Sequence, residues 1–160
     1  MSRTRSRQPA GSTAPGDDID LGPLGDLIPF NLRLAQDTAL QVFVQNSRER
    51  NFKPGHFAAL MIIRLNPGLT QIQLGRGISR DKSSVTPLVK GLERDGLIER
   101  RPSTFDRRSV TLQLTPKGEK HLDELLVHVR AHDRKVDELV GLENKPEFLR
   151  LLKKIIYELS

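Results

Sequence analysis

The chain of 160 residues is long enough to bury a hydrophobic core, and its 36% hydrophobic and 29% charged residues are typical of a soluble, helix-rich protein. It has no cysteine, which excludes disulfides, zinc–thiolate sites and thiol redox sensing. No signal peptide and no run of membrane-spanning length is evident, so we expect a cytoplasmic protein. The net charge of +6 is consistent with a polyanionic partner.

The positive charge is concentrated in two places. Residues 70–120 hold 11 basic and 6 acidic residues, whereas residues 1–16 hold three Arg and no acid. Residues 1–21 are too poor in apolar side chains to fold, so we predict a disordered basic tail. Its residues Arg3, Arg5 and Arg7 either contact DNA phosphates or only keep the chain soluble.

Helical periodicity begins after this tail. Apolar residues recur at helical spacing from about Leu24 to Asn46, with Pro29 either kinking this first helix or defining its start. Pro54 suits the first turn of a second helix, which stops at Asn66-Pro67-Gly68. Residues 22–53 and 116–160 are expected to dimerise, and residues 54–115 to form a separate functional unit within a single domain of residues 22–160.

Two short helices follow with a tight turn between them. Thr70 is expected to cap the first, Gly75 and Gly77 keep it short, and Gly77-Ile78-Ser79 forms the turn. Asp81 or Ser79 caps the second, which runs to about Asp95 and ends at Gly96. Its inward residues are Val85, Leu88, Val89 and Leu92.

A β-hairpin comes next. Residues 97–101 form one strand, and Val110, Leu112 and Leu114 alternate with Thr111 and Gln113 in the other, which predicts that the three aliphatic side chains share one buried face. The loop between the strands, residues 102–109, is polar and charged. A long helix from about Pro116 to Val140 and a last helix complete the chain. The last helix carries Phe148, Leu151, Leu152, Ile155, Ile156 and Leu159, more apolar surface than a monomer core needs, so we expect it to pack against a second copy.

A helical pair followed by a hairpin with a basic loop predicts a winged helix-turn-helix, in a mainly α fold with a small β-hairpin wing. Small or polar side chains at the exposed start of the second helix are placed to reach base edges in the major groove: Lys82, Ser83, Ser84 and Thr86. Lys90 and Arg94 suit phosphates, and Arg107 and Arg108 in the loop suit the minor groove.

At these positions the sequence resembles the MarR family of bacterial transcription regulators. The matching stretches are Pro67-Gly-Leu-Thr-Gln, Asp81-Lys-Ser-Ser-Val-Thr-Pro-Leu-Val, Leu92-Glu-Arg-Asp-Gly-Leu-Ile, Asp106-Arg-Arg-Ser and Leu114-Thr-Pro-Lys-Gly. The resemblance implies a homodimer with interlaced N- and C-terminal helices, bound to duplex DNA at a near-palindromic operator. It also implies that Arg108 enters the minor groove, that Asp106 supports the wing, and that Pro87 faces the major groove with Ser83, Ser84 and Thr86.

The resemblance further implies release from DNA when a small aromatic acid or a related metabolite binds between the dimer helices and the winged unit. Phe43, Phe57, Met61 and His56 are the candidates for an apolar slot, and Arg33 for a partner of the carboxylate or phosphate. We therefore expect a repressor whose effector is an aromatic acid or its coenzyme A thioester.

There are three alternatives to this function, and an enzyme, the first of them, is not expected. The chain has no nucleophile elbow, no phosphate-binding glycine loop and no acidic pair in a cleft-like context, so we expect neither catalysis nor a cofactor. His121, His128 and His132 share one helix, which leaves a metal-responsive regulator as an alternative, although we assign no metal ligands. The third alternative is an architectural DNA-binding protein that has no effector.

Overall fold

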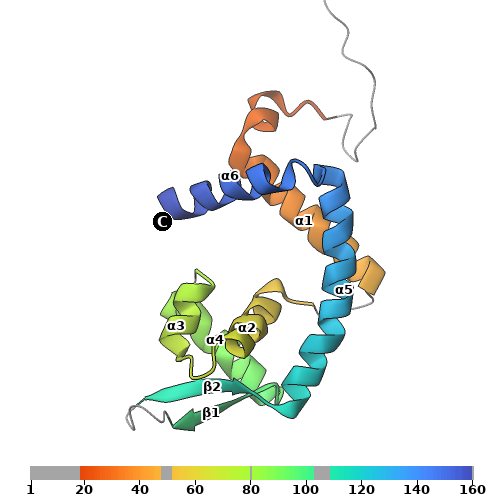
Figure 1. Cartoon of the computed structure of the whole chain (residues 1–160). Helices are drawn as coiled ribbons and strands as arrows, with labels where there is room; N and C mark the ends of the chain where they lie inside the picture. The colour runs from red at the N-terminus through yellow and green to blue at the C-terminus, as the bar shows by residue number, and fades with distance from the viewer. Residues whose placement is uncertain (1–18, 48–51, 80, 103–108, 160) are drawn as a thin grey trace, which may run out of the picture. The chain divides into compact units, whose positions relative to one another are not determined.

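The computed structural model describes residues 19–47, 52–79, 81–102 and 109–159. The elements follow in this order (Figure 1): η1 (Gly22–Asp26), α1 (Ile28–Ser47), α2 (Pro54–Leu65), α3 (Gln71–Gly77), α4 (Lys82–Arg94), β1 (Ile98–Pro102), β2 (Val110–Leu114), α5 (Pro116–Val140) and α6 (Lys145–Glu158). The predicted fold class, mainly α with a two-stranded hairpin, is confirmed.

Internal contacts divide the chain into two units after Thr38. In the first unit the 3-10 helix η1 ends at Asp26, the backbone of the next residue, Leu27, is extended, and α1 begins directly after it. The side chain of Asn31 donates hydrogen bonds to the carbonyls of Gly25 and Leu27, at 2.8 and 2.9 Å, which holds this junction. Pro29 lies in the first turn of α1, where its missing N–H costs no hydrogen bond, so it belongs to the start of the helix and causes no kink.

In the second unit, local caps fix where the helices of the winged region begin. Thr70 forms a reciprocal capping box with Gln73 at the start of α3. Ser79 takes a positive φ of 51° in the turn that follows. The carboxylate of Asp81 accepts the backbone N–H of Ser84 and so caps α4. Of the two caps that the sequence left open for this helix, Asp81 is the one observed.

The hairpin is antiparallel, with Ile98 opposite Leu114 and Pro102 opposite Val110. The prediction that Val110, Leu112 and Leu114 share one buried face is wrong at its first position, because Val110 is 46% exposed whereas Thr111 is buried. Thr111 bridges to Thr70, and its hydroxyl donates to the carbonyl of Arg101. Since Leu112 N–H also donates to the carbonyl of Leu69 at 2.8 Å, β2 is attached to the α2–α3 turn on one edge and to β1 on the other.

One core holds the winged region together. All four residues predicted to face inward from α4 are buried in it. Its buried members are Ala59, Leu60, Ile63, Leu74, Val85, Leu88, Val89, Leu92, Leu97, Ile98, Leu112 and Leu122. They come from α2, α3, α4, both sides of the hairpin and α5, so α4 is packed on every side except its polar one.

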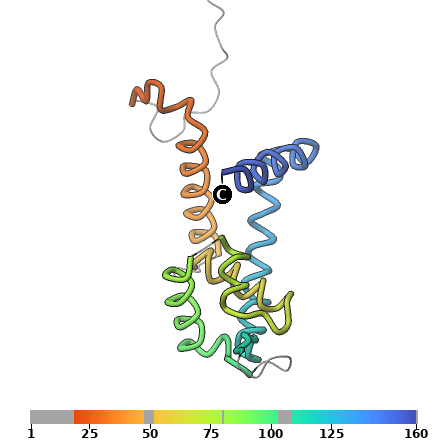
Figure 2. The backbone as a smooth tube through the Cα atoms, turned by 90° about the vertical axis from the view of Figure 1, so that its left-hand side faces the viewer, coloured from red at the N-terminus to blue at the C-terminus, as the bar shows by residue number. Residues whose placement is uncertain are grey.

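The long helix α5 connects this core to the C-terminal helix. In Figure 2 its first turns, in cyan, leave the hairpin and pass α2. Its first half buries Leu122 and Leu125, whereas α6 buries no residue in this single chain. None of the described helices is long and apolar enough to cross a bilayer.

Candidate nucleic-acid interface and ligand cavity

The exposed side of α4 carries one continuous stripe of side chains. Its buried residues occupy one side of the helix, and Ser83, Pro87, Lys90 and Arg94 occupy the other at i, i+4, i+7 and i+11 spacing. All four are exposed. The stripe begins with a hydroxyl, continues through an apolar ring and ends with two cations, an order that suits bases at the start of the helix and phosphates further along.

Polar contacts at the start of α4 constrain several of the predicted base-reading residues. Ser83 Oγ donates to Asp81 Oδ1 at 2.8 Å, and together with the N–H of Ser84 this bond lowers the pKa of the Asp81 carboxyl. Ser84 is half-buried and lies on the flank of the helix. Thr86 lies on the opposite flank, where its hydroxyl donates to the Lys82 carbonyl and accepts from the side chain of Gln71.

A chain of hydrogen bonds ties α4 to α3 and β1. Arg100 donates to Glu93 at 3.1 Å and to Gln71 at 3.0 Å, and Gln71 donates in turn to Thr86 at 3.0 Å. Sequence reasoning missed Arg100, because its two partners, Glu93 and Gln71, come from separate elements that only the fold brings together. The network fixes α4 against α3 and β1, so Arg100 holds α4 in place through its neighbours.

The C-terminal end of α4 has its own ion pair. Arg94 Nε donates to Asp95 Oδ1 at 3.0 Å, and this bond is the largest cause of the lowered pKa of the Asp95 carboxyl, with smaller contributions from the charges of His56 and Lys117. The wing residues Asp106, Arg107 and Arg108 lie outside the described residues, so their assigned roles stay predictions.

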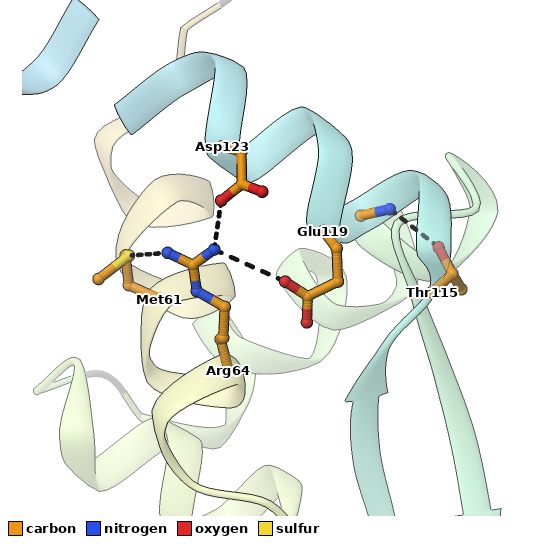
Figure 3. A network of polar contacts seen from close by, with 6 residues as sticks. Met61, Arg64, Thr115, Glu119 and Asp123 are labelled. Atoms are coloured by element: carbon orange, nitrogen blue, oxygen red, sulfur yellow. Dashed lines mark hydrogen bonds and ion pairs between the residues drawn. The ribbon is translucent and has the colours of Figure 1, made fainter. Parts of the chain in front are cut away.

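A second set of contacts clamps α2 to α5 (Figure 3). The guanidinium of Arg64 donates to Asp123 at 2.6 Å, lies 3.6 Å from Glu119, and contacts the sulfur of Met61. At the start of α5, Thr115 accepts the N–H of Gly118 at 3.0 Å. Met61 therefore packs between the core and this clamp, and it does not line the cavity described next.

A cavity of about 450 Å³ lies between α2, the end of α4 and the first half of α5. Its apolar lining is Phe52, Phe57, Leu60, Leu97 and Leu125, and its polar lining is Lys53, His56, Asp95, Lys117 and His121. Four basic side chains therefore face one carboxylate over an aromatic and aliphatic floor. This combination suits a flat apolar molecule that carries negative charge.

The residues predicted for an effector slot are only partly brought together. His56 and Phe57 line the cavity. Phe43 instead packs against Phe52, with ring centroids 4.2 Å apart, and lines a smaller hollow beside His128 and His132. Arg33 pairs with Asp37 at 2.9 Å within α1. The prediction overlooked Lys53, Lys117 and His121, because Lys53 is separated from the other two by at least 64 positions.

The histidines of α5 do not gather into a ligand set. Within the described ranges, no group of three or more His, Asp or Glu side chains is placed to hold a metal ion. His132 instead makes an edge-to-face contact with Phe43, at 5.6 Å between ring centroids.

A capped helical pair, a hairpin bonded to it and an exposed cationic stripe on the second helix define a winged-helix DNA-binding protein. Comparison with known proteins agrees. The model of the MarR family matches residues 52–110. A protein of Thauera aromatica named "Putative transcriptional regulatory protein for hcr operon" is 30% identical over 152 residues, which cover 93% of this chain and 92% of that one.

Two solved structures of the repressor CouR are also similar. One is bound to a 23-mer DNA duplex (TM-score 0.77, 28% identity, 86% of this chain and 98% of that chain). The other is bound to p-coumaroyl-CoA (TM-score 0.78, 26% identity, 88% and 99%). The chain belongs to the MarR family of DNA-binding transcription regulators.

Proposed function

We propose that this protein is a homodimeric repressor that binds a near-palindromic operator and is released from it by an aromatic acid or its coenzyme A thioester. The observation that carries the proposal is the 450 Å³ cavity, in which an aromatic and aliphatic floor meets four basic side chains. The cavity lies next to the C-terminal end of α4, which we assign as the recognition helix. A similar repressor bound to p-coumaroyl-CoA supports the same class of ligand.

The DNA interface in this proposal is the stripe of Ser83, Pro87, Lys90 and Arg94 together with the wing residues Arg107 and Arg108. Lys82, Ser84 and Thr86 flank the stripe. We assign Thr86 mainly to orienting α4, because its hydroxyl donates to the Lys82 carbonyl and accepts from Gln71, both within the protein. The second copy contributes an identical stripe, and two stripes related by a two-fold axis match two half-sites about one helical turn apart.

The size and charge of the cavity favour a regulator that responds to an organic anion over the two alternatives, a metal-responsive regulator and an architectural DNA-binding protein. A benzoate-sized acid fills part of 450 Å³, and the acyl end of a thioester fills more of it while leaving its phosphates near Lys53 and Lys117. For a metal-responsive regulator, the described residues contain no group of three or more His, Asp or Glu side chains that is placed to hold a metal ion. An architectural protein would have no need of such a cavity.

The experiment uses a labelled duplex that the purified protein selects from a random library. Fluorescence anisotropy measures the Kd for this duplex with and without benzoate, 4-hydroxybenzoate and their coenzyme A thioesters, and calorimetry measures the binding of each ligand to the free protein. We expect at least one of them to bind and to weaken the DNA complex by roughly 5- to 150-fold. If none binds and none weakens the complex, the proposed effector class is wrong.

The site of binding is checked with a matched pair of variants. His121→Phe retains a ring of similar size but removes a basic lining group, so ligand affinity should fall. His128→Phe makes the same change seven residues further along α5, outside this cavity, and should leave ligand affinity unchanged. Equal losses in both variants would place the ligand elsewhere.

A further inference from the structure

The side chain of Lys117 connects the ligand cavity to the recognition helix. Lys117 is the second residue of α5, and its ammonium donates to the backbone carbonyl of Asp95 at 2.7 Å. Asp95 is the C-cap of α4. The last carbonyls of a helix have no partner within the helix and carry a partial negative charge, so a cation at this place stabilises the end of the helix.

The backbone that carries Lys117 is held firmly against this helix end. Thr115 donates through its hydroxyl to Gly96 O at 2.6 Å and through its N–H to Leu97 O at 3.1 Å. A Cβ on Gly118 would lie 1.9 Å from Leu97 O, so only glycine allows α5 to approach this closely. The backbone at the start of α5 is therefore fixed, and from it the Lys117 side chain reaches the end of α4.

The same ammonium faces the cavity, where an anionic ligand would compete for it. Lys117, Asp95 and His56 all line the cavity, and the charges of Lys117 and His56 act on the Asp95 carboxyl. A ligand carboxylate or phosphate is a stronger partner for an ammonium than a neutral carbonyl, because the contact then joins two opposite charges instead of a charge and a dipole. A bound anion would thus draw Lys117 away from the carbonyl that it holds.

We propose that Lys117 couples the cavity to the DNA interface: it holds the C-terminal turn of α4 in the DNA-binding arrangement, and an anion in the cavity captures its ammonium and loosens that turn. This inference rests on the proposed function. The loosened turn contains Arg94 and follows directly after Lys90, the two cations of the exposed stripe. Lys117 is therefore a positioning residue that contacts no base in this account, and removal of its charge imitates the bound ligand.

The test compares full-length Lys117→Met with Lys117→Arg and with the control Lys120→Met. Lys120 lies three residues further along α5, is 82% exposed, and has only a 4.0 Å contact with Glu124, so the control removes the same charge without touching α4. Without ligand, we expect Lys117→Met to weaken binding to the selected duplex at least about 5-fold. Lys117→Arg should retain most of the affinity, and Lys120→Met should stay within about 2-fold of the unsubstituted protein.

Two further readouts separate coupling from other roles. The slope of log K against log salt should be unchanged in Lys117→Met, whereas loss of a phosphate contact would reduce its magnitude by about 1. Amide hydrogen exchange should become faster in residues 92–97 of Lys117→Met and stay unchanged in Lys120→Met. If Lys117→Met does not fold, Lys117→Gln is measured in its place.

Benzoate and benzoyl-CoA then test the capture step. They should weaken the DNA complex of the unsubstituted protein and of Lys120→Met, and have little further effect on Lys117→Met. Unchanged DNA affinity in ligand-free Lys117→Met, a reduced salt slope, or full release of Lys117→Met by the ligand would each overturn the inference. If neither probe binds any variant while ligand-free Lys117→Met shows the expected loss, the proposed effector fails and the role of Lys117 at α4 stands.

Discussion

Helices α4 and α6 are similar in length and pattern, but their apolar sides have different surroundings. α4 has 13 residues and buries Val85, Leu88, Val89 and Leu92 within its own chain. α6 has 14 residues and buries none, so that Phe148, Leu151 and Ile156 are 44%, 45% and 51% exposed. The same amphipathic pattern therefore predicts a helix equally well in both places, but it does not tell whether the partner is the same chain or another one.

This difference assigns separate tasks to the two helices. The apolar side of α4 packs within its own chain, and its exposed stripe remains accessible to DNA. α6 leaves a row of large apolar side chains uncovered, which is costly for a chain alone in water and is typical of a protein–protein interface. The following predictions test whether the core of α4 belongs to the monomer and the apolar side of α6 to the dimer.

The largest effect is expected in the core of α4. Leu92 is completely buried among residues of the winged core, so Leu92→Ala leaves a cavity and should lower the free energy of unfolding by about 2–5 kcal/mol. Urea denaturation at two protein concentrations measures it. The loss should be the same at both concentrations, and a loss that depended on concentration would mean that α4 takes part in the dimer.

Leu151→Asp should have its effect on assembly. A carboxylate placed in the apolar row of α6 must be desolvated in a dimer but remains in water in a monomer, so we expect the dimer Kd to rise by at least about 10-fold. Sedimentation equilibrium measures the change. Lys153→Ala, on the same helix, is the control and should leave the Kd nearly unchanged; a Leu151→Asp protein that dimerises normally would remove α6 from the interface.

Arg108→Ala tests the wing. We expect a loss of about 1–3 kcal/mol in binding to the selected duplex, because a cation is removed from a narrow, electronegative minor groove. A band-shift titration against a duplex with the same half-sites but a widened flanking groove, rich in G·C pairs, provides the comparison. Equal affinity of the variant and the unsubstituted protein for both duplexes would argue against the minor-groove role.

The smallest effect is expected at the helix caps. Asp81 caps α4 with its side chain, whereas Asn144, at the same position of α6, makes no side-chain cap hydrogen bond. Asp81→Ala should therefore lower the Tm more than Asn144→Ala does. Hydrogen bonds from Ser83 and Ser84 lower the pKa of Asp81, so its contribution is complete above its ordinary value of 3.8 and is lost as the pH falls through the lowered value. Thermal melts of both variants at pH 7 and at pH 3 check this order.

The sequence was sufficient for elements that are determined locally. Thr70 and Asp81 cap α3 and α4 through hydrogen bonds that span three residues, so the residue types alone predicted the first cap and narrowed the second to Asp81 or Ser79. Val110 and Thr111 show the limit of strand alternation. The bridge from Thr111 to Thr70 draws the threonine inward and leaves the valine exposed, and this pairing lies far away in the sequence.

The cavity was predicted less well because it is assembled from distant segments. His56 and Phe57 were found because both lie on one helix, whereas Lys117 and His121 meet them only through the packing of α2 on α5. Lys53, the N-cap of α2, was overlooked although it lies close to them in the sequence. Phe43 and Met61 have the right chemistry, but each is taken up by another contact, Phe43 by Phe52 and Met61 by Arg64. Apolar side chains at helical spacing identify a buried side of a helix and do not say whether it borders a core or a cavity.

Hydroxyl-radical footprinting on a genomic fragment that carries the selected sequence, with and without the effector identified by calorimetry, tests the central claim most directly. Two α4 stripes in one dimer predict a single protected region with two-fold symmetry, whose half-sites are centred about 10 base pairs apart, and the effector should erase it. Uniform protection along the fragment, or a footprint that the bound effector does not change, would contradict the account of a ligand-released repressor.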